Sequence, residues 1–468
     1  MVSAWQIING LQKRGGTLEF PFLVTWVFLL WMLPQAIAVS KISGIPEEAV
    51  DRLFGMMLLC FVGLIMGFQV GRRKGLKVVS VIDFISLRKL AVVSILFGAV
   101  FAILLKNVSE EELASSNWSG RTVAFLFLSQ PMFYGGALSL ALYLRKKDKV
   151  LLVFGACALL VVLGQIVVGG RRGPLVQFGL ATGCILYFLR GFEVPKAIFV
   201  VCIFVAAIFT NGIGIYRKTV YDGQQYGTNI DIAETGSRVV NGLFAVLEKY
   251  DELLLPTDCP EVLNATMFMQ TIENANIIDF GTDVWDHLVH TFFPGQILGR
   301  ELKAALQINW FGKIYKASGH KNAAGSTVTG LTDAYQSFRW LGFIKFFFVG
   351  YIMGFLWTGA CRGDFLAQLA YGCLLRPGLE AITHSTPLFY MGVINFAVLL
   401  GIFIYIISRQ FEKKLRRQQD WTRSLSMPRV ESVNGFNPLR PLTMQRRLAG
   451  VEKVFDGAQN GPKPTTTD

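Results

Sequence analysis

Charged residues are scarce in this sequence. Only 16% of its 468 residues are Asp, Glu, Lys or Arg, whereas 52% are hydrophobic, and its mean hydropathy is +0.45. A soluble domain usually has about a quarter charged residues. The low charge content therefore excludes an ordinary soluble protein and favours one embedded in lipid.

Cysteine is also infrequent, and its positions do not follow a metal-binding pattern. The seven cysteines lie mostly within apolar runs, without the Cys-x-x-Cys or Cys/His spacing of a zinc site. We therefore expect no disulfides, no structural metal and no cofactor. A cleavable signal peptide is not expected either, because the first apolar run begins near Phe20 and is long enough to span a membrane.

Among the few charged residues, basic ones predominate and give a formal net charge of +13. A basic excess is typical of nucleic-acid-binding proteins and of membrane proteins alike. Here the basic residues stand in short clusters between apolar runs, as the positive-inside rule requires of cytoplasmic loops. We therefore expect the lipid bilayer as a partner, and no nucleic acid.

Ten apolar stretches have, or approach, the roughly 20 residues that a transmembrane helix needs. Basic clusters at 72–77, 145–147 and 413–417 follow the second, fourth and tenth stretch, which predicts that both termini are cytoplasmic. The predicted fold is all-α, a polytopic membrane protein with about ten transmembrane helices and one large external, mostly helical loop. The ten stretches are residues 20–39, 54–71, 90–106, 122–144, 150–168, 174–190, 197–215, 341–359, 365–385 and 388–408.

These stretches divide the chain into five regions. The external loop is longer than a simple connection, and its apolar spacing predicts short helices at about 233–254, 280–291 and 299–309. The tail is basic and then rich in Gly, Pro and Thr, which is typical of disorder. The regions are a cytoplasmic N-terminus (1–19), transmembrane helices (20–215), the loop (216–340), further transmembrane helices (341–408) and a cytoplasmic tail (409–468).

A glycine-rich break with two arginines lies between the fifth and sixth stretches. Its sequence is Gly169-Gly170-Arg171-Arg172-Gly173-Pro174. The predicted topology places Arg171 and Arg172 outside, against the positive-inside rule. Guanidinium groups bind phosphate through paired hydrogen bonds, and glycines allow a close approach of the backbone. The break can therefore anchor a lipid-linked phosphate, although two arginines that only reach external headgroups fit the same sequence.

The ninth stretch carries three ionisable residues at helical spacing. Arg376, Glu380 and His384 recur every four residues and so share one helix face. Such groups are costly at membrane depth and usually face a cavity or a partner. Pro377 and Gly378 predict an interruption of the helix beside Arg376. The carboxylate or the imidazole can act as a base beside a cation, or the set can be an internal ion pair.

The external loop adds further polar candidates. His287 and His290 are spaced for a shared metal, but no third ligand is placed near them, so we expect a surface helix and no metal there. The candidates for binding or catalysis in and beside the loop are Arg217, Arg238, Arg300, Asp333 and Tyr335.

Three short stretches resemble motifs of one protein family. Together with the topology over residues 20–408, they are similar to the bacterial oligosaccharide repeat-unit polymerases, the O-antigen polymerase or Wzy-type family. The sequence departs from the family pattern at Asp333, where glutamate is more frequent, and at Arg339, where glycine is usual. The stretches are Gly169 to Leu175 with the helix ending in Tyr187-Phe188-Leu189, His290 to Pro294 followed by Arg300, and Gly330 to Gly342.

The resemblance implies a metal-independent glycosyltransferase of the bacterial inner membrane. It would transfer a growing glycan from polyprenyl diphosphate onto the next lipid-linked repeat unit of an O-antigen, capsule or exopolysaccharide, at the outer membrane face. A flippase and a chain-length regulator of the same pathway are implied partners. The implied roles are diphosphate binding by Arg376 with Arg171 or Arg172, a base among Glu380, His384 and Asp333, and glycan or phosphate binding by Arg217, Arg238, Arg300 and Tyr335.

Other interpretations stay open. A ligase similar to O-antigen ligases shares the topology and the donor but uses a different acceptor. A transporter or flippase would use Arg376 and Glu380 as a substrate or proton site, although no internal repeat is apparent. A scaffold of a polysaccharide assembly complex would need no catalytic residue. An exosortase-like transpeptidase is disfavoured, because Cys259 has no histidine close in sequence.

Overall fold

The structure is a computed structural model that describes residues 2–75, 82–106, 121–167, 172–204, 260–293, 299–308, 314, 316–319 and 327–426. Within these ranges every regular element is a helix, which confirms the all-helical expectation. The chain divides into two compact units, Met1–Lys413 and Lys414–Asp468. Of the second unit, only the end of one helix is described.

The predicted apolar stretches coincide with helices. After α1 (Val2–Gln12) and η1 (Gly16–Leu18), the first half contains α2 (Phe20–Val27), η2 (Phe28–Met32), α3 (Leu33–Val39), α4 (Glu47–Arg72), α5 (Phe84–Lys106), α7 (Arg121–Lys146), α8 (Lys149–Val167), α9 (Arg172–Arg190) and a helix over 196–204. The second half contains η3 (Arg339–Gly342), α19 (Phe343–Cys361), α20 (Phe365–Thr383), α21 (Thr386–Phe396), η4 (Ala397–Gly401) and α22 (Ile402–Ser426).

Six stretches of the described chain are helical, long and apolar enough to cross a membrane, and we conclude that this is a membrane protein. They correspond to six of the ten predicted stretches, and the described parts of the other four are helical as well. The count of about ten and the external side of the loop remain predictions. The six are Phe20–Val39, Glu47–Arg72, Phe84–Leu105, Val123–Lys146, Thr329–Cys361 and Thr386–Gln419.

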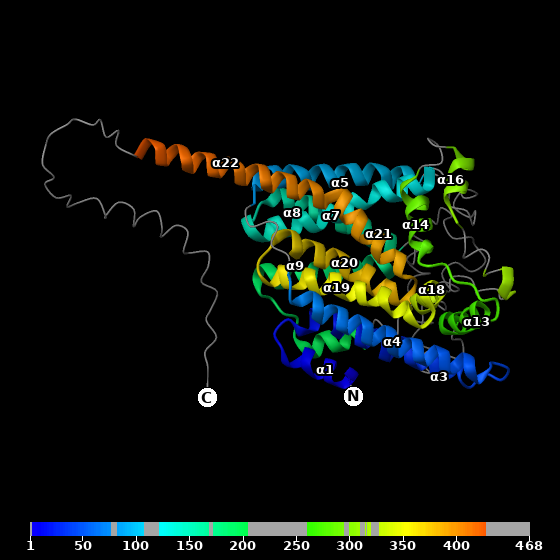
Figure 1. Ribbon diagram of the computed structural model, residues 1–468. Coiled ribbons are helices and arrows are strands. Elements are labelled where there is room, and N and C mark those ends of the chain that lie inside the picture. Colours follow the sequence, from blue (N-terminus) through cyan, green and yellow to red (C-terminus); the bar gives the residue numbers. More distant parts are fainter. Residues whose placement is uncertain are drawn as a thin grey trace, which may run out of the picture. The chain divides into compact units, whose positions relative to one another are not determined.

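Four shorter helices pack at one end of the long ones (Figure 1). They are α13 (Pro260–Asn274), α14 (Thr282–Phe292), α16 (Arg300–Leu306) and α18 (Thr329–Phe338). Helices α14 and α16 confirm the short helices predicted at 280–291 and 299–309. The helix predicted at about 233–254 lies outside the described residues. Helix α13 contacts α3, α4 and α18, and α14 contacts α21, so these helices form part of the same packed unit.

Helices α4 and α19 pack backbone against backbone along glycine faces. A Cβ on Gly67 would lie 1.9 Å from the carbonyl oxygen of Phe347, and one on Gly350 would lie 2.0 Å from that of Leu64. Real Cβ atoms do not approach oxygen so closely, so glycine is required at these positions. Small residues four apart are the usual way for helices in lipid to gain close van der Waals contact. Gly71 of α4 and Gly354 of α19 make similar approaches, at 2.1 Å.

Two of the basic clusters that predicted the topology, at the ends of α4 and α7, lie at the other end of these helices. The hydroxyl of Thr358, near the end of α19, donates to the backbone oxygen of Arg72, at the end of α4. The guanidinium carbon of Arg145, at the end of α7, lies 4.9 Å from the ring centre of Phe365, which begins α20. One end of the bundle therefore collects basic helix termini, as one membrane side should.

The turn from α18 into α19 departs from ordinary backbone geometry. Arg339 has φ 54° and ψ −132°, in the region that glycine favours. Such a conformation costs a non-glycine residue about 1–3 kcal/mol, and the contacts of the Arg339 side chain, described below, offset it.

We expect Gly67→Ala to destabilise the protein by about 1–3 kcal/mol, because the added methyl group must separate α4 from α19. The matched control is Gly155→Ala in α8, where a Cβ would have its nearest neighbour, Ser139 Oγ, at 3.6 Å. The measurement is the midpoint of heat-induced loss of monodisperse protein in detergent, followed by size-exclusion chromatography. Similar midpoints for the two variants would contradict the glycine contact.

Candidate functional site

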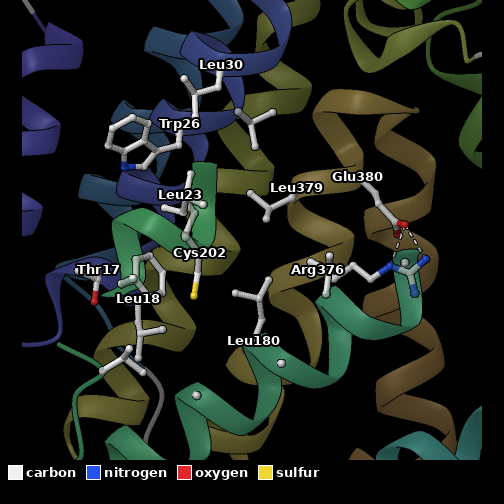
Figure 2. Close-up of a pocket in the computed structure, with 18 of the residues that line it drawn as sticks. Thr17, Leu18, Leu23, Trp26, Leu30, Leu180, Cys202, Arg376, Leu379 and Glu380 are labelled. Carbon is white, nitrogen blue, oxygen red and sulfur yellow. Dashed lines mark hydrogen bonds and ion pairs between the residues drawn. The ribbon is translucent and has the colours of Figure 1, made fainter. Parts of the chain in front are cut away.

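A cavity of about 560 Å³ lies between the N-terminal helices, α9 and α20. Most of its wall is apolar, and its volume is in the range of small-ligand and cofactor sites. Figure 2 shows leucines of α2, α9 and α20 facing one another across it, with Arg376 and Glu380 at one end. The apolar wall includes Leu18, Leu23, Trp26, Leu30, Val176, Leu180, Leu186, Phe199 and Leu379.

Helix α9 contributes one whole face to the cavity, and glycines open that face. Gly173, Gly179 and Gly183 line the cavity together with the apolar residues between them, which recur every three to four positions. A Cβ on Gly179 would have no neighbour within 4 Å, and one on Gly183 would only reach Leu18 at 3.8 Å. Because Gly179 and Gly183 have no side chain, they leave open space in the cavity. No neighbouring helix packs closely on them.

Irregular backbone lies on the opposite wall. Residues Phe28–Met32 form a π-helical turn, η2, between α2 and α3. Pro34 follows this turn, and proline removes a helical hydrogen bond and crowds the carbonyl four residues before it. The wider turn accommodates that change. Leu30 and Trp31, both in the π-turn, line the cavity.

The polar end of the cavity is built by one face of α20. The Nε and Nη2 atoms of Arg376 lie 2.8 and 2.6 Å from Glu380 Oε1, and its Nη1 donates to Gln177 Oε1 at 2.7 Å. About a quarter of each ionic side chain is exposed, 25% for Arg376 and 23% for Glu380. His384 lines the same end of the cavity. The three residues predicted to share a helix face therefore meet at one site.

The glycine-rich break meets the same site. A Cβ on Gly173 would lie 2.4 Å from Arg376 Nη2, so the guanidinium packs directly on the first turn of α9. Helix α9 begins at Arg172, and Arg171 lies outside the described residues. The described part of the break, at Gly173, therefore lies next to Arg376.

Helix α20 continues through Pro377 and ends at Thr383, so the predicted interruption beside Arg376 was wrong. Two glycines make room for side chains around the proline. The Pro377 ring packs on Gly392, and Phe20 packs on Gly378. The chain instead breaks after Thr383, whose hydroxyl lies 2.8 Å from His384 Nδ1.

Asp333 of α18 holds the start of the next helix. Its Oδ2 accepts hydrogen bonds from the backbone N–H of Thr386 at 2.8 Å and from its hydroxyl at 2.5 Å. Thr386 is the first residue of α21 and lies two residues after His384. Asp333 therefore fixes the turn that carries the histidine, and its side chain is only 11% exposed.

A buried lysine joins two carboxylates from different helices. Lys345 Nζ, near the start of α19, makes a short ion pair with Asp333 and lies 3.1 Å from both oxygens of Asp283 in α14. It also donates to Ser337 Oγ at 3.1 Å. The side chains of Lys345 and Asp283 are 7% and 15% exposed. Removal of the single cation would leave two buried carboxylates without compensation, which is strongly destabilising.

The two carboxylates have unequal roles. Asp333 takes the shorter contact with Lys345 and both donors of Thr386, which favour its ionised form. Burial raises the pKa of Asp283 well above its usual range, and the negative charge of the neighbouring Asp333 adds to this rise, although Lys345 opposes it. Asp283 is therefore the carboxylate that retains a proton most readily.

Tyr335 lies on the other side of α18 and is almost fully buried. Its hydroxyl donates to Glu273 Oε2 at 2.6 Å, and that oxygen also accepts from Arg339 Nη1 at 2.7 Å. The guanidinium carbons of Arg339 and Arg52 lie 5.4 and 6.0 Å from the ring centre of Tyr335. Tyr335 thus supports a second polar group at the surface, separate from the cavity.

The other candidates are not brought to the cavity by the described residues. Arg217 and Arg238 lie outside these residues, and Arg300 begins α16. His287 and His290 lie on α14, where Nδ1 of the first is 3.0 Å from the Asp283 carbonyl oxygen. Within the described ranges no three His, Cys, Asp or Glu residues are grouped to hold a metal ion.

Sequence reasoning missed Lys345, Asp283 and Gln177. Lys345 had a usable signal, because it is an isolated charge in a phenylalanine-rich apolar stretch. Asp283 and Gln177 had none, since their partners are 62 and 199 residues away in the chain.

No protein-family model matches this sequence, and no curated protein and no solved structure shows significant similarity to it.

We expect the contribution of Asp283 to the stability of the protein to fall as pH rises above 3.8, the ordinary pKa of an aspartate, because the raised pKa of this group makes it bind more proton in the folded state than in the unfolded state. Asp283→Asn removes this titration, so the midpoint of the variant should fall less, or rise more, with pH than that of the wild type. The measurement is the unfolding midpoint in detergent from about pH 4 to about pH 8. Asp51→Asn, at an exposed position of α4, is the control and should keep the wild-type slope. An unchanged slope in Asp283→Asn would refute the assignment.

Proposed function

We propose that this protein is a membrane glycosyltransferase that polymerises polyprenyl-diphosphate-linked oligosaccharide repeat units at the outer face of the bacterial inner membrane. The observation that carries the proposal is the apolar cavity that ends on Arg376 and Glu380. A lipid-linked sugar diphosphate has the matching order of parts, which is a long apolar chain, an anionic diphosphate and a hydroxyl-rich glycan.

The apolar part of the cavity suits an isoprenoid chain. The α9 face that lines it extends from Gly173 to Leu186, which is about 20 Å along a helix axis. A linear hydrocarbon of this length can lie along the open glycine face. There it would contact leucine and tryptophan side chains of the cavity wall, and no longer the lipid tails of the bilayer. The cavity therefore favours a long, unbranched or methyl-branched chain over a compact ligand.

The polar end suits the diphosphate. An entering diphosphate would compete with Glu380 for the Arg376 guanidinium, which binds phosphate oxygens through paired hydrogen bonds. The first turn of α9 lies against the same guanidinium and adds helix N-terminal N–H groups and the positive end of the helix dipole. Arg172, the first residue of α9, and Arg171, which precedes it in the sequence, are proposed as further diphosphate ligands.

The reaction needs one proton acceptor. The acceptor hydroxyl oxygen attacks the anomeric carbon of the donor sugar, the bond between that carbon and the diphosphate oxygen breaks, and polyprenyl diphosphate leaves with the electron pair. Once the diphosphate occupies Arg376, the Glu380 carboxylate is released to accept the hydroxyl proton. His384 lines the same end of the cavity and is the alternative base. Asp333 is proposed to position His384 through Thr386.

The ligase alternative uses the same donor site and differs only in the acceptor. Analysis of lipid-linked glycan after deletion of the gene separates the interpretations. Single repeat units on polyprenyl diphosphate support the polymerase, complete polymer without its final acceptor supports a ligase, and repeat units held on the cytoplasmic side support a flippase. A normal glycan pattern would refute all three.

We expect Arg376→Gln and Glu380→Gln to fail at different steps. The first removes a charged hydrogen-bond donor and should weaken donor binding about tenfold or more. The second keeps the shape of the side chain but removes the base, so transfer should fall about 100-fold or more while donor binding is retained. The measurements are elongation of purified lipid-linked repeat units, with and without a chelator, and donor binding by native mass spectrometry. Normal elongation by both variants would overturn the proposed site.

We expect Gly179→Leu to block the cavity without disturbing the fold, because the new side chain enters space that no other atom occupies within 4 Å of a Cβ. Elongation should fall at least about tenfold, while the unfolding midpoint stays near that of the wild type. Gly155→Leu, a helical glycine of α8 outside the cavity wall, is the matched control and should elongate normally. Full activity of Gly179→Leu would show that the cavity does not hold the lipid.

A further inference from the structure

A second polar group lies at the surface where α4, α13 and the turn after α18 meet. Arg339 Nη1 donates to Glu273 Oε2 at 2.7 Å and its Nη2 to Asn276 Oδ1 at 3.1 Å, while Arg52 Nη1 donates to Gln270 Oε1 at 2.7 Å. The group therefore combines guanidinium, carboxylate and amide side chains from three segments that are far apart in the sequence.

An exposed aromatic ring lies beside this group. Trp340 is 45% exposed and makes an edge contact with Tyr335 at 6.0 Å between ring centres. Its indole packs on α4 at Gly55, where a Cβ would lie 2.7 Å from the ring. Glycine at this position lets the indole pack closely against the helix backbone. Part of the Trp340 ring remains exposed and accessible to a ligand.

The backbone of Arg339 indicates that its side chain is specifically required there. The residue keeps φ 54°, which glycine would adopt without strain. A residue that only had to form the turn would be glycine. The strained arginine therefore points to a task for the guanidinium beyond chain reversal.

We propose that Arg339, Glu273, Asn276 and Trp340 form a saccharide-binding platform that holds the glycan of a lipid-linked substrate. The inference rests on the proposed glycosyl transfer. A pyranose ring stacks its apolar face on an aromatic side chain, and its hydroxyls both donate and accept hydrogen bonds. Arg339 supplies donors, Glu273 supplies acceptors, and the amide of Asn276 supplies both.

The central carboxylate of Glu273 favours a saccharide over a lipid headgroup phosphate, although the guanidiniums of Arg339 and Arg52 flank it. Glu273 is 45% exposed on its side chain and sits at the centre of the group. The hydrogen bond from Tyr335 lowers the pKa of Glu273, and the charges of Arg339 and Arg52 add to the effect, so the carboxylate is ionised at neutral pH. An ionised carboxylate repels phosphate, which only accepts hydrogen bonds, but it binds sugar hydroxyls.

The position of the platform fits an extended glycan. Helix α18 connects it to α20, the helix that bears Glu380, because Gly330 packs on the backbone of Ala381 in α20 and Arg339 follows the other end of α18. The ten residues of α18 span about 15 Å. An oligosaccharide of a few sugars bridges this length, so one end of the glycan can reach Glu380 while another rests on Trp340.

The test is binding of lipid-free oligosaccharide to the full-length protein in nanodiscs. The probe is the surface polysaccharide of the source bacterium, hydrolysed to fragments of one to three repeat units. Arg339→Gly should weaken binding about tenfold or more, because charged hydrogen bonds are lost. Its unfolding midpoint should stay near that of the wild type, because the relaxed turn offsets the lost contacts of the side chain. Glu273→Gln should also weaken binding.

Lys147→Gly is the matched control. Lys147 also has a left-handed backbone, with φ 57°, and its Nζ lies 5.1 Å from the ring centre of Tyr143 at the other end of the bundle. This variant relaxes the same kind of strain and should bind the fragments normally. Unchanged binding by Arg339→Gly, or loss of bound anionic phospholipid in place of oligosaccharide, would overturn the platform.

The result is separable from the proposed function. If deletion causes accumulation of lipid-linked repeat units but Arg339→Gly binds fragments as the wild type does, the platform fails and the glycosyltransferase stands. If Arg339→Gly loses binding but deletion leaves the glycan pattern normal, the platform stands and the polymerase fails.

Discussion

The contact between α4 and α19 is the constraint on which the remaining structure depends. Lipid tails are as apolar as leucine, so apolar side chains gain no hydrophobic free energy when two helices associate in a membrane. The helices associate instead through close van der Waals packing. The glycines of both helices bring the backbones together, with Gly67 against Phe347 and Gly350 against Leu64. This contact sets the depth and rotation of α19. It therefore also sets the places of Trp340 and Lys345, which precede and begin that helix.

The rotation of α19 determines which helices can pack at its start. Lys345 points to Asp333 in α18 and Asp283 in α14, so one cation attaches two shorter helices to the long ones. Asp333 then holds Thr386, which orders the turn that bears His384. The packing of two glycine faces is in this way connected to the proposed site through Lys345 and Asp333, neither of which lines the cavity.

The sequence predicted the helices well because the required signal is local. Runs of about 20 apolar residues mark spanning helices, and the four-residue spacing of Arg376, Glu380 and His384 places them on one face whatever the surrounding fold. The interruption predicted at Pro377 was wrong, because α20 continues through the proline and a glycine makes room for its ring. Gly392, which accepts that ring, lies on a different helix.

The rest of the site depends on contacts between distant segments. The cavity exists because glycines of α9 face the π-turn of η2 without filling the space, and a sequence does not say which glycines pack and which leave a gap. Gly67 and Gly179 look alike in the sequence, yet a Cβ would meet a backbone oxygen at the first and nothing at the second. Likewise, the sequence does not show that Arg339 adopts a positive φ, a conformation that favours glycine.

The α4–α19 contact also has a consequence for biosynthesis. Arg72 at the end of α4 and its partner Thr358 at the end of α19 are 286 residues apart in the chain. At about 5–20 residues per second, the ribosome completes α4 on the order of 15 to 60 s before α19. During that interval the glycine face of α4 lies in the bilayer without α19. Any other helix with small residues can then compete with α19 for packing on this face. The correct pairing is thus decided late in translation, and the cavity, the Lys345 cluster and the platform can form only after it.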